Sequence, residues 1–72
     1  MNKSVYINEY KNIIKRLKQA RLDVGLSQQE VADKLGKPQS YVSKSESGDR
    51  RLDVAEMKRI AEIYKKPASH FL

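Results

Sequence analysis

The segment GLSQQEVADKLGKPQSYVSKSESG, residues 25–48, encodes two short helices joined by a tight turn. Ser27 with Glu30 three residues later forms a capping box, a common start of a helix. Gly36 is suited to end this helix, because glycine tolerates the left-handed conformation frequent at helix C-termini. Pro38 is suited to the first turn of the next helix. Two helices joined by a turn of about three to four residues with a glycine can place the second helix in a DNA major groove.

The remaining sequence predicts further helices, so the expected fold is all-α: a compact bundle of five helices. Apolar residues recur at spacings of three and four within residues 10–24. Asp53 and Glu56 repeat the capping-box pattern before a second such stripe. Lys65 and Lys66 are expected in the last turn of that helix, where cations oppose its dipole. The expected helices are 7–24, 28–35, 39–47 and 54–66, with a final turn that begins at residue 67.

The composition limits the possible classes of protein. At 72 residues the chain is short enough for a single domain with a small core. It contains no cysteine, so a disulfide framework and a thiolate metal site are both excluded. No apolar run is long enough for a signal peptide or a membrane span, so we expect a cytoplasmic protein without a membrane partner.

Positive charge is in excess and unevenly distributed. The formal net charge is +6, with lysine and arginine concentrated in residues 1–21 and again at Arg50 and Arg51. This distribution favours a polyanionic partner, and duplex DNA is the densest polyanion available. Solubility alone is the alternative explanation, because small helical domains are often rich in lysine.

Residues 17–72 resemble the lambda-repressor/Cro-type helix-turn-helix family, also called the XRE family. The resemblance rests on RLKQARLDVGLSQQEVADKLG, on SYVSKSESGDRRL, and on the proline and the Phe-Leu pair near the C-terminus. It implies a lambda-repressor-like bundle of five helices, in which the second and third helices bind operator DNA. Residues 1–16 then form an N-terminal arm and the start of an extended first helix, which the family pattern does not define.

The predicted third helix has a polar face suited to reading bases. Helical spacing places Gln39, Ser40, Ser43, Lys44 and Ser47 on this face. A merely solvated face would more often carry Glu/Lys pairs. Glutamine can bond adenine, lysine favours guanine, and serine can address either kind of edge. We therefore expect base contacts from Gln39, Ser40, Ser43 and Lys44.

Polar and basic residues around these two helices are candidates for phosphate contacts. Gln28 lies in the first turn of the second helix, where free backbone N–H groups favour a phosphate. The resemblance implies that this glutamine also braces Gln39. Packing is an alternative role for Tyr41, and bracing of the fourth helix is one for Arg51. The full set is Gln28, Lys37, Tyr41, Ser47, Arg50 and Arg51.

Three positions inside the bundle concern stability. The resemblance implies that Arg21 and Glu46 form a partly buried ion pair between the first and third helices. Ser45 departs from the family, which usually has a large aliphatic or aromatic residue there. A serine gives up roughly 1–3 kcal/mol of burial, so loose packing of the third helix is expected.

The expected function is that of a bacterial or phage transcriptional regulator, a repressor or controller, which binds an inverted-repeat operator. As a homodimer it would place two recognition helices about 34 Å apart. Two alternatives stay open: an antitoxin-type protein-interaction module with secondary DNA binding, and the DNA-binding domain of a longer regulator. The expected dimer contacts are Tyr64, Phe71 and Leu72, with core packing an equal alternative for the first two.

An enzyme is not expected. His70 is the single histidine, and no residues have the spacing of a metal site. The three glycines do not form a phosphate-binding loop. The sequence therefore predicts no catalytic residue, no metal and no cofactor.

Overall fold

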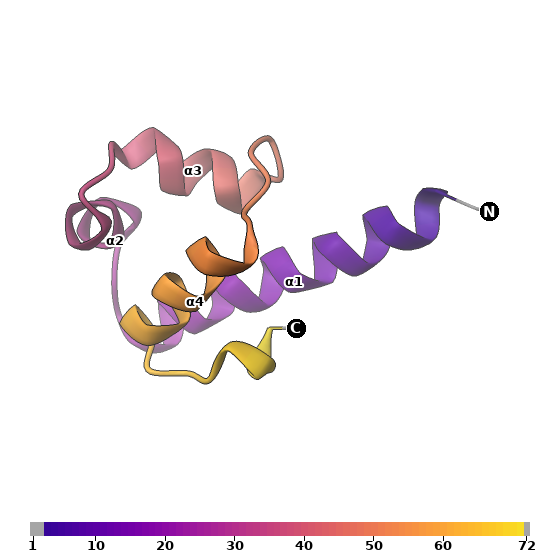
Figure 1. The fold of residues 1–72 in the computed structure, drawn as a ribbon. Coiled ribbons are helices and arrows are strands. Elements are labelled where there is room, and N and C mark those ends of the chain that lie inside the picture. Colours follow the sequence, from indigo (N-terminus) through magenta and orange to yellow (C-terminus); the bar gives the residue numbers. More distant parts are fainter. Residues whose placement is uncertain (1–2, 72) are drawn as a thin grey trace.

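The computed structural model describes the backbone of residues 3–71 and the side chains of residues 8–71. In this range the chain forms α1 (Lys3–Asp23), α2 (Gln28–Leu35), α3 (Gln39–Ser47), α4 (Val54–Ile63) and a short 3-10 helix, η1 (Ala68–His70) (Figure 1). No strand occurs in the described part of the chain, so the all-α prediction is confirmed. Residues 3–71 also contain no helix with the length and apolarity needed to cross a membrane.

The prediction of a fifth α-helix is wrong. The last element is a single 3-10 turn, held by hydrogen bonds of 2.9 Å from the His70 amide to the Pro67 carbonyl and of 3.1 Å from the Phe71 amide to the Ala68 carbonyl. Both bonds join residues three apart, the pattern of a 3-10 helix. The chain thus makes only one tight turn before Phe71 enters the core.

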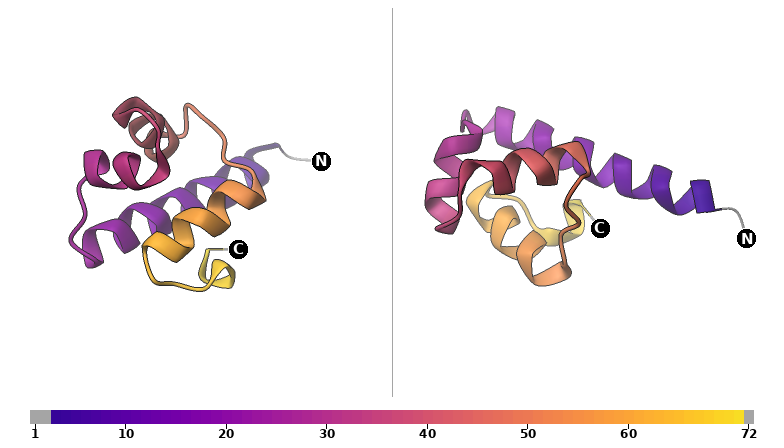
Figure 2. Two further views of the ribbon diagram at one scale, coloured as in Figure 1. Left: turned by 60° about the vertical axis from the view of Figure 1, so that its left-hand side comes forward. Right: turned by 90° about the horizontal axis from the view of Figure 1, so that it is seen from above.

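Helix α1 starts earlier than predicted and gives the molecule its length. It begins at Lys3 instead of residue 7, and the longest dimension of the molecule is 39 Å, against 23 and 20 Å for the others. The N-terminal part of α1 projects beyond the other helices (Figures 1 and 2). Among the described side chains, its buried residues begin only at Ile14. The projecting part therefore lies outside the packed bundle.

Local side-chain chemistry sets the predicted ends of α2 and the start of α4. The Glu30 amide donates to the Ser27 hydroxyl at 3.0 Å, and the Ser27 amide donates to the Glu30 carboxylate at 2.9 Å. Gly36 ends α2 with a φ of 69°, a conformation that costs little only for glycine. Asp53 and Glu56 form a second reciprocal capping box at the start of α4. These local predictions are confirmed.

The end of α4 differs from the prediction. The helix stops at Ile63, so Lys65 and Lys66 follow it and do not lie in its last turn. Lys65 adopts a φ of 58°, and the amides of both lysines bond back to carbonyls of the preceding turn. This left-handed residue reverses the chain, as at many helix C-termini. The reversal carries Phe71 into the core, where its side chain is fully buried.

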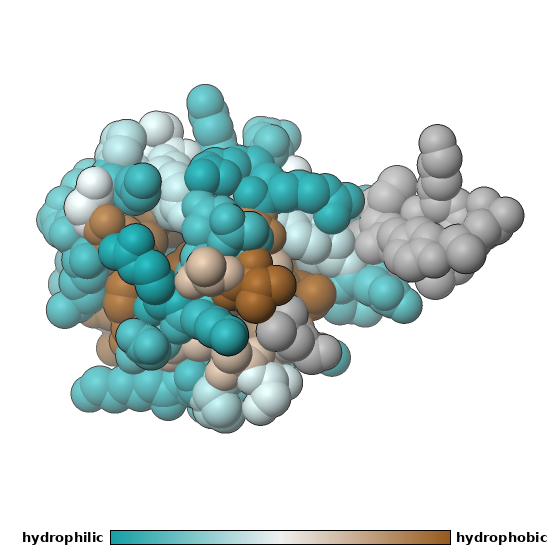
Figure 3. Space-filling view, viewed as in Figure 1, coloured by the Kyte–Doolittle hydropathy of each residue, from teal (hydrophilic) through white to brown (hydrophobic). Residues whose placement is uncertain are grey.

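The four helices pack around one hydrophobic core. Helices α2 and α3 lie against each other at one side of the bundle, and the outer side of α3 is not covered by another helix (Figure 2). The residues over α3 form a hydrophilic surface at the top of Figure 3. The core consists of Leu17, Ala20, Val31, Ala32, Leu35, Val42, Leu52, Met57, Ile60, Ala61, Tyr64 and Phe71.

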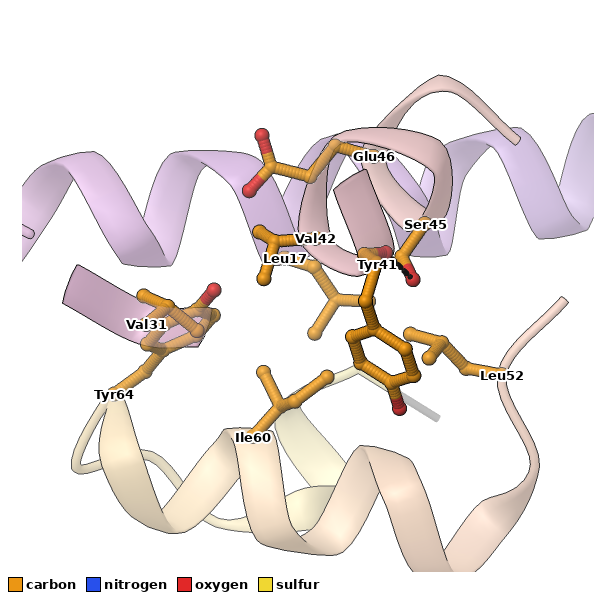
Figure 4. Close-up of a pocket in the computed structure, with 9 residues that line it drawn as sticks. All are labelled: Leu17, Val31, Tyr41, Val42, Ser45, Glu46, Leu52, Ile60 and Tyr64. Carbon is orange, nitrogen blue, oxygen red and sulfur yellow. Dashed lines mark hydrogen bonds between the residues drawn. The ribbon is translucent and has the colours of Figure 1, made fainter. Parts of the chain in front are cut away.

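Ser45 is buried in α3 and fits its surroundings closely. Its hydroxyl donates to the Tyr41 carbonyl at 2.6 Å, so the polar group is satisfied (Figure 4). The cavity beside it, lined in part by Leu52 and Ile60, has a volume of only about 10 Å³. That is the lower limit for one water molecule. The neighbouring side chains have closed around the serine, and the gap left by the smaller residue is correspondingly small.

Candidate nucleic-acid interface

The outward face of α3 presents short polar side chains on a rigid support. Gln39, Ser40 and Lys44 are exposed and Ser43 is half-buried, whereas Val42 points into the core. The structure thus brings the predicted base-contacting residues together on one surface. A B-DNA major groove is about 12 Å wide and admits one α-helix. Small side chains on this face let the helix approach base edges closely.

A buried ion pair joins α3 to α1 on the side of α3 that faces the core. Arg21 donates to the Glu46 carboxylate through Nε at 2.7 Å and through Nη2 at 3.0 Å, and both side chains are only 8% exposed. The third nitrogen, Nη1, donates to the Leu26 carbonyl at 2.9 Å. The hydrogen bonds that Arg21 donates to Glu46 raise the pKa of Arg21 above its ordinary value. Helix α1, the turn before α2 and the end of α3 are therefore joined at one point.

Two glutamines extend this ion pair to the first residue of α3. Gln28 Nε2 donates to Glu46 Oε1 at 3.0 Å, and Gln39 Nε2 donates to Gln28 Oε1 at 2.7 Å. An amide group has two N–H donors and one oxygen acceptor. Gln39 therefore keeps its oxygen and a second N–H, the pair of groups needed to bond adenine bidentately. The network holds the Gln39 side chain in one orientation.

Tyr41 lies at the centre of a charged cluster beside α3. The Arg50 guanidinium lies 4.5 Å from the centre of the tyrosine ring, and Lys37 Nζ lies 5.6 Å from it. The tyrosine hydroxyl donates to Glu56 Oε2, and Arg50 Nη2 donates to the same oxygen at 2.8 Å. Arg50 Nη1 donates to the Arg51 carbonyl at 3.0 Å. The Tyr41 hydroxyl and both terminal nitrogens of Arg50 are thus engaged within the chain.

The cluster shifts the pKa values of its two acidic groups in opposite directions. Burial, followed by the hydrogen bond to Glu56, raises the pKa of Tyr41 to about 12. The hydrogen bond from Tyr41, with a second from the Asp53 amide and the charge of Arg50, lowers the pKa of Glu56. At neutral pH, Tyr41 is therefore a neutral donor and Glu56 a carboxylate.

A groove of about 370 Å³ lies between α1 and the loop after α3. Its lining includes the basic residues Lys11, Lys15 and Arg51 and the acidic residues Glu46 and Asp49. The Arg51 guanidinium lies 4.4 Å from the centre of the Tyr10 ring.

No group of three acidic or histidine side chains that could hold a metal ion occurs among the described residues.

Tyr10 and Glu56 have structural roles that the sequence did not predict. The Tyr10 hydroxyl accepts a hydrogen bond of 2.9 Å from the Leu52 amide and so ties α1 to the loop before α4. Glu56 was expected only to cap α4. Glu56 also accepts hydrogen bonds from Tyr41 and Arg50. No local sequence pattern predicts these contacts or the contact of Tyr10 with Leu52.

Two of the three residues predicted for a dimer contact, Tyr64 and Phe71, are not on the surface. Tyr64 is 2% exposed and Phe71 is 0% exposed, so both side chains belong to the core, the alternative role that the sequence left open. Burial raises the pKa of the Tyr64 hydroxyl. Leu72 lies outside the described residues. Neither the Tyr64 ring nor the Phe71 ring is therefore accessible to a second chain in this structure.

Known proteins were found with the same sequence pattern and the same fold. Residues 17–71 match the family model described as helix-turn-helix. Among solved structures, an XRE-family like protein from Pseudomonas syringae pv. tomato str. DC3000 has a TM-score of 0.90 and 35% sequence identity. The match covers 96% of this chain and 84% of that chain, so it also spans most of the long first helix. No curated protein matches the chain.

Proposed function

The chain belongs to the XRE family of helix-turn-helix proteins, a family of DNA-binding regulators, and we propose that it recognises a specific operator with α3 in the major groove. The observation that carries this proposal is the hydrogen-bonded network from Arg21 to Gln39. Such a network serves a purpose at a surface that must present a side chain in one orientation. The ion pair also stabilises the fold, but a face needed only for solubility has no reason to orient the exposed Gln39 through Gln28.

Base recognition is assigned to the exposed face of α3. Gln39 offers its remaining donor and its acceptor to an adenine, and Lys44 offers its ammonium to the O6 and N7 of guanine. Ser40 and Ser43 are short enough to reach either kind of base edge. Each good bidentate pair contributes roughly 1–3 kcal/mol of discrimination against the wrong base.

Phosphate contacts are assigned to the edges of this face. Gln28 lies in the first turn of α2, where backbone N–H groups favour an anion. Lys37 follows α2, Ser47 ends α3, and Arg51 lies exposed in the following loop. Contacts of this kind fix the register of the protein on DNA and carry no sequence information themselves.

Regulation is proposed to occur through a homodimer on an inverted repeat. Two chains would place their α3 helices in successive major grooves, about 34 Å apart. A dimer bound in this way would act as a repressor or controller wherever its operator overlaps a promoter. Because Tyr64 and Phe71 are buried in each chain, the dimer contact is proposed to use other residues.

Selection of binding sites from a randomised duplex pool, at low and at near-physiological salt, tests the proposal. Enrichment of an inverted repeat that persists at the higher salt is expected. Replacement of Gln39 by alanine should relax the preference at one base of each half-site, whereas Arg59→Ala on α4 serves as a matched surface control. If no sequence is enriched and binding is lost at the higher salt, the protein is only attracted to phosphates, and the proposal is overturned.

A further inference from the structure

We propose that Glu56 withholds Arg50 from DNA phosphates and thereby limits the binding of this protein to duplexes of unrelated sequence. The inference rests on the proposed function, because it concerns the DNA-facing side of the same domain. It assigns Arg50 a role different from the phosphate contact that the sequence predicts. Glu56 then sets the sequence-independent part of the affinity for DNA, although it need not touch DNA.

Arg50 is held by three interactions within its own chain. One terminal nitrogen donates to Glu56 at 2.8 Å, the other donates to the Arg51 carbonyl at 3.0 Å, and the guanidinium plane lies over the Tyr41 ring. An exposed ion pair alone is weak. Here the contact with the Tyr41 ring and a second hydrogen bond hold the guanidinium beside the Glu56 carboxylate, so a phosphate that approaches Arg50 also meets a negative charge.

Glu56 is itself fixed on both of its oxygens. Oε1 accepts the amide of Asp53 at 2.9 Å as part of the capping box, and Oε2 accepts from both Tyr41 and Arg50. The carboxylate also lies at the start of α4, where the helix dipole favours a negative charge. It is therefore ionised and held in place, and it cancels the charge of Arg50 locally.

The cancellation matters because binding to any DNA sequence depends on how many cations meet phosphates. Each neutralised phosphate contributes about 0.9 to the slope of log affinity against log salt concentration. A regulator must find its operator among a large excess of unrelated sites. Removing Arg50 from this count weakens the sequence-independent part of the binding, so the base contacts assigned to Gln39 and Lys44 supply a larger share of the affinity for an operator.

The test measures the affinity for a short duplex of unrelated sequence over about 50–200 mM salt. The variants are Glu56→Gln, Arg50→Gln, the double substitution and Glu30→Gln. Glutamine suits the third position of a capping box, so the start of α4 is preserved. Glu30 is the matched control, because it has the same capping position in α2 but caps Ser27 without holding an arginine.

Release of Arg50 should appear as one additional phosphate contact. Glu56→Gln is expected to steepen the salt slope by about 0.9 and to raise the affinity for unrelated DNA more than Glu30→Gln does. Arg50→Gln alone should leave the wild-type slope unchanged, and it should abolish the gain when combined with Glu56→Gln. Equal effects of the two glutamate substitutions would overturn the inference. So would a flatter slope for Arg50→Gln alone, since Arg50 would then already contact a phosphate.

The inference and the proposed function can fail separately. If the wild-type chain does not distinguish a selected operator from unrelated DNA, the proposed function is wrong. The salt slopes of the variants would still show whether Glu56 keeps Arg50 away from phosphates. If the wild-type chain binds no duplex, salt elution from a heparin column replaces the measurement: later elution of Glu56→Gln than of Glu30→Gln supports the inference, and equal elution refutes it. Should Glu56→Gln fail to fold, the slope of Arg50→Gln alone decides.

Discussion

Replacement of Arg21 by methionine is expected to destabilise the domain by about 3–5 kcal/mol, the usual cost of breaking a buried ion pair. Arg21 is 7% exposed and donates hydrogen bonds from all three of its nitrogens, two to Glu46 and one to the Leu26 carbonyl. Without it, the Glu46 carboxylate stays buried with Gln28 as its neutral donor. The cost therefore comes mainly from the charge that is left behind.

This loss is large for a domain of such size. Typical stabilities of about 0.05–0.15 kcal/mol per residue give roughly 4–11 kcal/mol in total. A small domain loses about 4–8 °C of melting temperature per kcal/mol, so Arg21→Met should melt at least about 12 °C below the wild type. Thermal unfolding followed by far-ultraviolet circular dichroism at neutral pH measures the shift. An unchanged melting temperature would refute the reasoning.

Two further substitutions separate the charge from the geometry. Arg21→Lys keeps the charge but cannot make the forked contact, so its melting temperature should lie between those of Arg21→Met and the wild type. The double substitution with Glu46→Met removes the stranded carboxylate and should be more stable than Arg21→Met alone. It should still bind operator DNA poorly, because Gln28 then lacks the carboxylate that anchors it. A double variant with full DNA affinity would show that the glutamine network is dispensable.

Two other predictions concern the packing and the protonation of the α3 region. Ser45→Leu should lower the free energy of unfolding by about 1–3 kcal/mol, because a larger side chain overfills its tight site; a higher midpoint in urea unfolding would contradict this. In phenolate absorbance, Tyr41 should ionise near pH 12, and at lower pH in Glu56→Gln. Because this folded pKa exceeds the unfolded value of 10.0, its stabilising effect is complete below pH 10 and is lost as the pH rises towards 12. A titration unaffected by Glu56→Gln would show that Glu56 does not act on the phenol.

The sequence predicted best those features that depend on neighbouring residues. The capping boxes at Ser27 and Asp53 and the left-handed Gly36 need only contacts within a few residues, and all three are present. The apolar periodicity of α1 likewise placed Leu17 in the core. Two of these signals bear on the helix-turn-helix, because Ser27 sets the start of α2 and Gly36 sets its end.

Predictions failed where distant parts of the chain determine the local structure. Nothing around Lys65 signals a left-handed residue, since the turn there depends on the burial of Phe71 in the core. The early start of α1 at Lys3 was also missed, and its first turn contains no acidic residue. Periodicity identifies a helix more reliably than it identifies its ends.

The surface of α3 was predictable, whereas the partners of its charged neighbours were not. Helical spacing was enough to place Gln39 and Lys44 on one face. Glu56, in contrast, showed only its capping role in the sequence, because its contacts with Tyr41 and Arg50 require α4 to lie beside α3. The sequence pattern alone does not show which of several nearby basic residues will pair with a given carboxylate.

The charge count of the chain therefore describes its interaction with DNA incompletely. A net charge of +6 predicts attraction to any polyanion. The structure, however, pairs Arg21 with Glu46 beneath α3 and Arg50 with Glu56 beside it. The first pair holds the glutamine network that orients Gln39, and the second withdraws a cation from the edge of the recognition face. In both cases an acidic residue holds a cation in a defined geometry, as the proposed recognition of one operator requires.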